Sequence, residues 1–80
     1  MSPERVVVYG KPGCHLCEEA VAVVARVCGD AGVGWAERDI SGDAELMRTY
    51  GEQIPVTFVD GRQHDFWRVD ELRLRTALRR

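Results

Sequence analysis

The spacing of apolar residues along this 80-residue chain changes repeatedly between a strand-like and a helix-like pattern. A β-branched run of strand length comes first, and apolar side chains at helical spacing follow it. Shorter blocks of both kinds occupy the rest of the chain. Together they predict the order β-α-β-α-β-β-α, with strands at residues 5–9, 33–38, 56–59 and 62–66 and helices at 15–28, 70–78 and a short segment ending at 50.

Turn and capping residues set the limits of these elements. Gly29 and the glycines after it end the first helix, and either Ser41 or Asp43 caps the second. Asp60-Gly61 between two strand-like runs is a strong signal for a two-residue hairpin. Asp70 is well suited to cap the last helix.

In that last helix, Leu74 and Leu78 share an apolar face, and Leu72 lies about 160° from Leu74 on the helical wheel. We therefore expect Leu72 to be exposed. The neighbouring arginines are interpreted as a solvated face near a favourable helix C-terminus rather than as a binding patch. These arginines are Arg73, Arg75, Arg79 and Arg80.

The connections between the elements predict the sheet. The two β-α-β connections imply parallel pairing at its start, and the hairpin implies antiparallel pairing at its end. We expect one α/β domain over residues 1–80, in which a mixed four-stranded sheet is flanked by helices.

Candidate chemistry is concentrated where the first strand meets the first helix, because Cys14 and Cys17 lie there three positions apart. One helical turn brings such positions to the same face, and a Cys-x-x-Cys pair at this place is typical of a redox site. Cys14 falls at the N-cap, where unpaired backbone N–H groups favour a thiolate, the attacking species in disulfide exchange. Lys11 and His15 add positive charge nearby, whereas the glutamates at 18 and 19 oppose it.

Helical geometry distinguishes the two sulfurs. Cys17 lies on the apolar stripe with Val21, Val24 and Cys28, so it points toward the core, whereas Cys14 faces the open end of the helix. We therefore expect Cys14 to attack and Cys17 to resolve. Cys28 is too far along the helix for a disulfide with either and is interpreted as a small buried apolar residue.

The composition argues against several kinds of partner and indicates the compartment in which this chemistry takes place. A net charge of −2 gives no support for nucleic-acid or membrane binding, and no apolar stretch approaches the length of a membrane span. The first residues lack the features of a secretory signal, so we expect a cytoplasmic protein. We also expect it to act as a monomer. In a reducing compartment a Cys-x-x-Cys pair is more often catalytic or metal-binding than structural.

Two other functions fit the same motif. A metal or iron–sulfur binding module would use Cys14 and Cys17 as two ligands, and the rest would come from a dimer or from borrowed thiols, since a structural zinc site wants four. His64 lies on the far hairpin and is interpreted as a solvated side chain. A redox-inert binding adaptor is the other alternative, and the presence of both cysteines argues against it.

Three segments of the chain match a known family: residues 9–17, Ile54-Pro55-Val56 and residues 69–72. With them the chain resembles the glutaredoxin branch of the thioredoxin superfamily over essentially its whole length, and most of all the small glutaredoxin-like proteins of bacteria. The resemblance implies a thioredoxin-like fold and a thiol–disulfide oxidoreductase, in which Cys14 is the nucleophile and Cys17 the resolving cysteine.

The same resemblance assigns further residues to substrate binding. Ile54-Pro55 would be a cis-proline segment that faces the sulfurs, and its backbone would pair with the substrate like an added strand. Lys11 and Asp70 match the positions at which glutaredoxins hold the carboxylates of glutathione. Glutathione would then be a co-substrate, with no tightly bound cofactor.

Two segments depart from the glutaredoxin pattern. Phe66-Trp67-Arg68 stands in place of a Gly-Gly pair, and its bulk hinders the close backbone approach that glutathione needs. Trp67 instead offers an apolar surface to a larger partner. His15-Leu16 replaces the common Pro-Tyr between the cysteines. We therefore expect a disulfide-bearing protein as substrate, a protein thiol or flavoprotein system as the better reductant, and weak activity on glutathione mixed disulfides.

Overall fold

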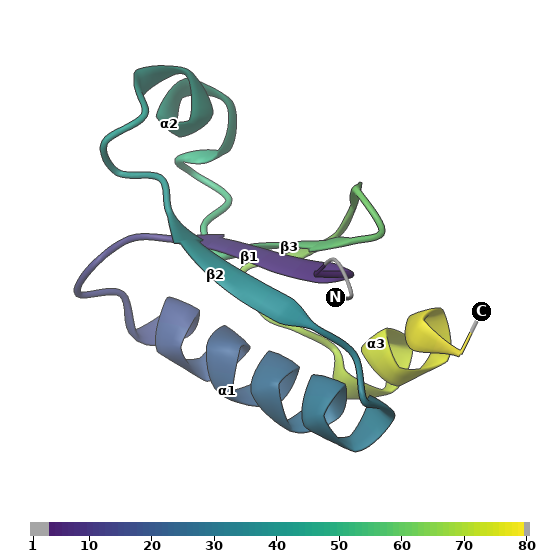
Figure 1. The fold of residues 1–80 in the computed structure, drawn as a ribbon. Coiled ribbons are helices and arrows are strands. Elements are labelled where there is room, and N and C mark those ends of the chain that lie inside the picture. Colours follow the sequence, from purple (N-terminus) through teal and green to yellow (C-terminus); the bar gives the residue numbers. More distant parts are fainter. Residues whose placement is uncertain (1–3, 80) are drawn as a thin grey trace.

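The computed structural model describes residues 4–79 and contains the seven elements in the predicted order (Figure 1). The α/β class and the element order are therefore confirmed, and Arg80 lies outside the described residues. The strands are β1 (Val6–Gly10), β2 (Trp35–Asp39), β3 (Val56–Val59) and β4 (Arg62–Phe66), and the helices are α1 (His15–Ala31), α2 (Ala44–Tyr50) and α3 (Glu71–Leu78).

The four strands form one mixed sheet in the order β2-β1-β3-β4. β1 pairs in parallel with β2 and antiparallel with β3, and β3 pairs antiparallel with β4. The expectation of parallel pairing is thus right for the first β-α-β connection and wrong for the second. The 7 residues of α2 rise only about 10 Å, too little to return the chain along the sheet, so β3 begins near the end at which β2 finishes.

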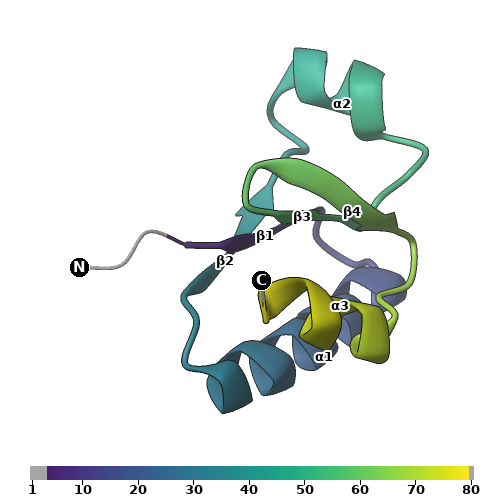
Figure 2. The same ribbon diagram turned by 90° about the vertical axis from the view of Figure 1, so that its right-hand side faces the viewer.

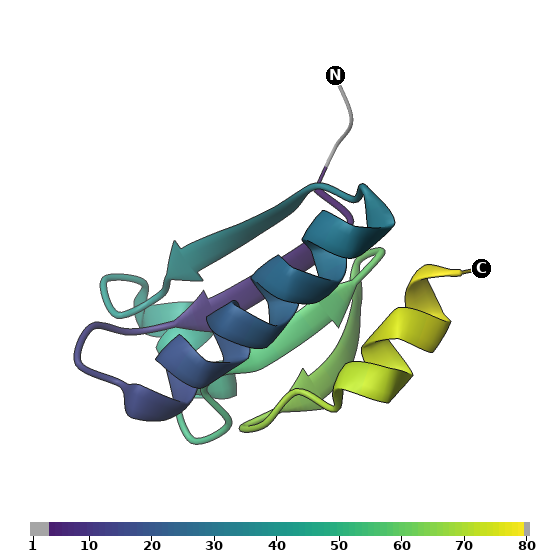
Figure 3. The same cartoon turned by 90° about the horizontal axis from the view of Figure 1, so that it is seen from below.

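The helices are divided between the two faces of the sheet. α1 and α3 cover one face and α2 the other (Figure 2), and a view from below shows α1 and α3 side by side (Figure 3). The main core lies between the sheet and the helices α1 and α3. Its buried residues are Val6, Val8, Ala20, Val24, Val27, Cys28, Val59, Leu74 and Leu78.

The α2 face is held differently, because α2 has no fully buried residue. Tyr9, Tyr50 and Phe58 form an aromatic cluster in which Tyr50 meets each of the other rings edge-on. The centroids of Tyr9 and Phe58 are 4.8 Å apart. Edge-to-face pairs of this kind add to the free energy of burial. They hold α2 on the sheet at the end that carries Cys17.

Element boundaries match the predictions at the hairpin, whereas β1 lies at 6–10 rather than 5–9, β2 lies at 35–39 rather than 33–38, and α1 ends later than predicted. Asp60 and Gly61 both have positive φ, as a two-residue hairpin of the predicted kind requires. α1 does not end at Gly29 but continues to Gly32, which takes a left-handed conformation (φ 68°) and donates its N–H to the carbonyl of Cys28. A glycine inside a helix lowers its stability by about 1 kcal/mol relative to alanine. The hydrogen bond from Gly32 to the last-turn carbonyl of Cys28 offsets this cost.

The predicted faces of α3 are confirmed, but its arginines are not merely solvated. Leu72 is 74% exposed and Leu74 is buried. Arg75 contacts Glu71 at 2.8 Å and Asp30 of α1 at 3.0 Å. The solvated interpretation is wrong at Arg75 because α1 and α3 lie side by side and bring acidic groups within its reach.

The same ion pairs extend across the two helices. Arg26 of α1 donates to Glu71 at 2.7 Å, so Glu71 binds two guanidinium groups. Hydrogen bonds from Arg26 and Arg75 lower the pKa of Glu71 to about 2. Arg73 pairs with Asp65 of β4 at 2.7 Å, which also departs from the solvated interpretation.

Within residues 4–79, no helix is long and apolar enough to cross a membrane.

Candidate redox site

Cys14 and Cys17 form a disulfide at the N-terminus of α1. Gly13 has a φ of 71°, a conformation that glycine adopts without strain, and it turns the chain from the loop into the helix. Cys14 is the N-cap, and its sulfur accepts a hydrogen bond from the backbone N–H of Cys17 at 3.1 Å. One sulfur therefore lies where the helix presents its unpaired N–H groups, as the sequence predicts.

The two sulfurs occupy different environments. Cys17 is only 2% exposed and packs with Ile40 and Ile54 in a second apolar cluster, whereas Cys14 is partly exposed at its edge. An incoming thiol or disulfide reaches Cys14 more easily than Cys17. This difference in burial agrees with the helical wheel.

Gly10 at the end of β1 allows the close approach of Cys17. A Cβ atom at this position would lie 3.2 Å from Cys17 Sγ, closer than ordinary van der Waals contact, and 3.9 Å from Glu37 Oε2. Glu37 lies opposite Val8 in the parallel β1–β2 pair and so faces the helix side of the sheet. Sequence reasoning missed Glu37 as a neighbour of the site, although its place in the alternation of β2 was a usable signal.

Ile54 and Pro55 are joined by a cis peptide bond, as the resemblance implies. Ile54 shares the apolar cluster of Cys17, and Pro55 is buried. Within residues 4–79, the backbone N–H and carbonyl of Ile54 have no hydrogen-bond partner. Unpaired backbone groups of this kind are available to an extended peptide.

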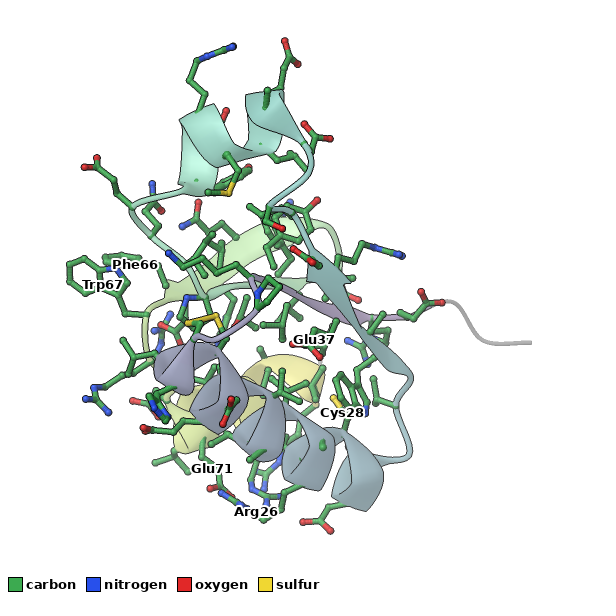
Figure 4. All side chains as sticks on the ribbon, turned by 90° about the vertical axis from the view of Figure 1, so that its left-hand side faces the viewer. Arg26, Cys28, Glu37, Phe66, Trp67 and Glu71 are labelled. Atoms are coloured by element: carbon green, nitrogen blue, oxygen red, sulfur yellow. A yellow bond between two sulfur atoms is a disulfide. The ribbon has the colours of Figure 1, made fainter. Side chains whose placement is uncertain are left out.

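Phe66 and Trp67 project from the side of the molecule that carries the disulfide (Figure 4). They are 49% and 51% exposed, and their rings meet edge-on with centroids 5.0 Å apart. Together with Leu16 and Ile54 they line a shallow depression, with Arg68 at its rim. We call Leu16, Ile54, Phe66 and Trp67 the aromatic shelf.

Trp67 is held in an unusual backbone conformation. Its φ is 63°, a left-handed value that is uncommon for a bulky residue. Its backbone N–H donates to the carbonyl of Pro55 at 2.7 Å, and its indole Nε1–H donates to the carbonyl of Glu52 at 2.9 Å. Such strain persists only where the surroundings fix it, and here Trp67 is tied to the segment that leads into the cis-proline.

The other predicted binding residues lie around this centre without forming one pocket. His15 is exposed in the first turn of α1, and Lys11 lines a separate depression with Glu37. Asp70 caps α3 by accepting the backbone N–H of Arg73 at 3.0 Å, so its carboxylate already has a partner.

His64 is not solvated as predicted but largely buried, because its side chain lies in the groove between β4 and α3. Among residues 4–79, no three His, Cys, Asp or Glu side chains are grouped closely enough to hold a metal ion.

Comparison with known families places this geometry in context. The family described as Glutaredoxin-like domain (DUF836) matches residues 5–79. The chain belongs to this family. The uncharacterized protein Rv0508 of Mycobacterium tuberculosis is 31% identical to this glutaredoxin-like domain over 85 aligned positions, which cover 100% of this chain and 88% of Rv0508.

Solved structures support the same assignment. This glutaredoxin-like domain is 33% identical to XcR50 from X. campestris, with a TM-score of 0.76 over 92% of this chain and 95% of that one. For Ne2328 from Nitrosomonas europaea the identity is 30% and the TM-score 0.77, over 92% and 89% of the two chains. Glutaredoxin C1 from Populus, at 19% identity, shares the fold with a TM-score of 0.63 over 95% of this chain and 84% of that one.

Proposed function

We propose that this glutaredoxin-like domain is a thiol–disulfide oxidoreductase that cycles between a Cys14/Cys17 dithiol and disulfide. The observation that carries the proposal is the unequal placement of two bonded sulfurs. Cys14 is accessible and accepts a helix N-terminal N–H, while Cys17 is buried directly behind it. Such a pair is suited to one attacking and one resolving thiol.

The reaction proceeds in two exchanges. The Cys14 thiolate attacks one sulfur of a substrate disulfide, the substrate S–S bond breaks, and the other substrate sulfur leaves as a thiolate that takes a proton from water. Cys17 then loses its proton and attacks Cys14, which releases the second substrate thiol and forms the Cys14–Cys17 disulfide. Two electrons have passed to the substrate, and an external thiol or flavoprotein reductant returns two to the protein.

The residues around the site favour a protein rather than glutathione as thiol donor. The carboxylate of Asp70 already accepts a hydrogen bond as the cap of α3. Trp67 and Arg68 place bulky side chains where glutathione would need close backbone contact. Lys11 and His15 remain as exposed side chains on either side of Cys14 in the chain. We propose a disulfide-bearing protein as substrate, a reducing cytoplasm as setting, and no tightly bound cofactor.

Single-cysteine variants test this function. A disulfide-linked fluorescent peptide pair should be reduced by the dithiol form of the wild type and by Cys28→Ala, which leaves the motif intact. Cys14→Ser should lose all measurable reduction. Cys17→Ser should still form a mixed disulfide, visible as an added peptide mass, but should not resolve it intramolecularly. Equal loss of mixed-disulfide formation in Cys14→Ser and Cys17→Ser would refute the assigned roles.

A further inference from the structure

The aromatic shelf adjoins the sulfur cluster through Ile54, and its two aromatic rings are left half exposed within residues 4–79. Phe66 and Trp67 each leave about half of their surface in water, which is costly for aromatic groups unless a partner covers them. Leu72 is the other exposed large apolar residue of the described part of the chain, but it lines a different groove with His64 and Arg73. The shelf is therefore distinct from scattered surface hydrophobicity.

Several contacts hold the two rings of the shelf in place. The indole is fixed through Nε1 to the carbonyl of Glu52, the backbone N–H of Trp67 is fixed to Pro55, and Phe66 packs edge-on against the indole. At the rim, Arg68 pairs with Glu19 of α1 at 3.4 Å, so its charge is partly neutralised. A preformed aromatic surface binds without the cost of ordering its own side chains.

The sulfur chemistry limits what can cover this surface. Leu16 lies between Cys14 and Cys17 in the chain, and Ile54 packs against the same sulfur cluster, so both connect the shelf to the disulfide. A substrate attached to Cys14 through a mixed disulfide is tethered at one end of the shelf. The residue beside its cysteine is then the part of the substrate closest to Phe66 and Trp67.

We infer that the aromatic shelf binds a large apolar side chain next to the reactive cysteine of an extended substrate segment. This inference rests on the proposed function and names the substrate class for that site. Phe66 and Trp67 are specificity-determining residues. Small thiols lack the side chain that covers the shelf, and segments with a short polar residue at that position leave it in water.

The test uses chromophoric disulfides that report the first exchange. Two short peptides, identical except for Phe or Ser beside a single cysteine, are each linked through that cysteine to a nitrothiobenzoate group, and mercaptoethanol carries the same group as a small substrate. Attack by Cys14 on the peptide sulfur releases the coloured thiolate. Wild type should react about tenfold faster with the Phe peptide than with the Ser peptide, the size of effect expected of one interface anchor.

Matched variants locate the preference. Phe66→Ser and Trp67→Gly should each bring the Phe-to-Ser rate ratio close to one, and Gly suits the left-handed backbone at 67. Leu72→Ser, which removes an even more exposed apolar side chain elsewhere, should keep the ratio. Because each ratio is taken within one variant, a general loss of reactivity cancels.

The outcomes separate the two proposals. Wild type that releases thiolate from the mercaptoethanol derivative but shows no Phe preference overturns the shelf and leaves the oxidoreductase standing. A preference that survives in both shelf variants overturns it as well. Wild type that attacks none of the three substrates overturns the proposed function itself.

Discussion

Cys17 and Cys28 lie on one stripe of α1 and are buried to nearly the same degree, with 2% and 0% of their surfaces exposed. Their surroundings nevertheless differ in kind. Cys17 is bonded to a partly exposed sulfur at the helix N-terminus, whereas Cys28 lies in the valine-rich core between the sheet and α3. Burial raises the pKa of the Cys28 thiol, although Arg5 opposes the effect. Burial alone therefore does not decide the chemistry of a cysteine; the groups at each end of the helix do.

The largest expected effect is on alkylation by iodoacetamide. In the reduced protein at neutral pH, Cys14 should be modified first, and Cys28 should react at least about a thousandfold more slowly, because it is reached only by opening the core. Mass spectrometry of peptides at timed points measures both rates. Addition of denaturant should remove the difference. Equal rates in the native protein would show that the two ends of α1 do not differ as described.

A second test changes the core cysteine itself. Cys28→Ser should lower the free energy of unfolding by about 2 kcal/mol, because it buries a hydroxyl among apolar side chains. Cys28→Ala removes the sulfur without adding a polar atom and should cost about 1 kcal/mol. Urea unfolding of both variants under reducing conditions gives the comparison. A Ser variant as stable as the Ala variant would mean that a polar partner or water reaches this position.

Gly10→Ala probes the opposite end of the helix. The new Cβ would lie 3.2 Å from Cys17 Sγ, and the disulfide fixes that sulfur more firmly than the free thiol does. The variant should therefore disfavour the oxidised form by about 1 kcal/mol, roughly 20 mV in reduction potential. Equilibration with a dithiothreitol redox series measures the potential.

Gly29→Ala is the control for this change, since a Cβ at position 29 meets nothing within 4 Å. It should leave the potential unchanged while it stabilises α1 slightly. If both glycine variants shift the potential equally, the contact at Gly10 is not the cause.

The smallest expected effect concerns the ion pairs between α1 and α3. The pKa of Glu71 is lowered from 4.5 to about 2 by Arg26 and Arg75, so its contribution to stability is fully present above about pH 4.5 and is lost as the pH falls toward 2. Glu71→Gln should reduce stability at neutral pH only slightly and should flatten its dependence on pH over that range. Both effects should shrink in high salt, because the groups are half exposed.

Urea unfolding at several pH values follows this dependence, with Glu45→Gln as the control. Glu45 carries the same charge in the first turn of α2 and has no ion-pair partner in residues 4–79. A pH profile altered equally by both substitutions would trace the effect to net charge rather than to the pairs.

The sequence was most informative where chemistry depends on local spacing. The N-cap position of Cys14, the hairpin at Asp60-Gly61 and the exposure of Leu72 all follow from neighbouring residues within one turn or one loop. The unequal burial of Cys14 and Cys17 belongs to the same class, since a single helical wheel determines it.

Features that depend on contacts distant in the chain were missed or wrong. The direction of β3 depends on how far α2 carries the chain, and one of the two partners of Arg75, Asp30, comes from α1, 45 positions away. Hydrogen bonds to the carbonyls of Pro55 and Glu52 hold Trp67 in its left-handed conformation. The residues next to Trp67 in the sequence give no signal for these contacts. Gly29 shows the converse, because a residue that ends many helices stays inside this one.

The position of β1 has a mechanical consequence for the redox site. β1 is bonded along both sides, to β2 and to β3, and its last residue leads into the loop that carries Cys14. The loop therefore connects an interior strand, which is hydrogen-bonded on both sides, to a helix of 17 residues. Fluctuations that loosen the outer strands leave both supports in place. The segment that holds Cys14 and Cys17 is thus anchored by two elements that do not depend on the outer strands.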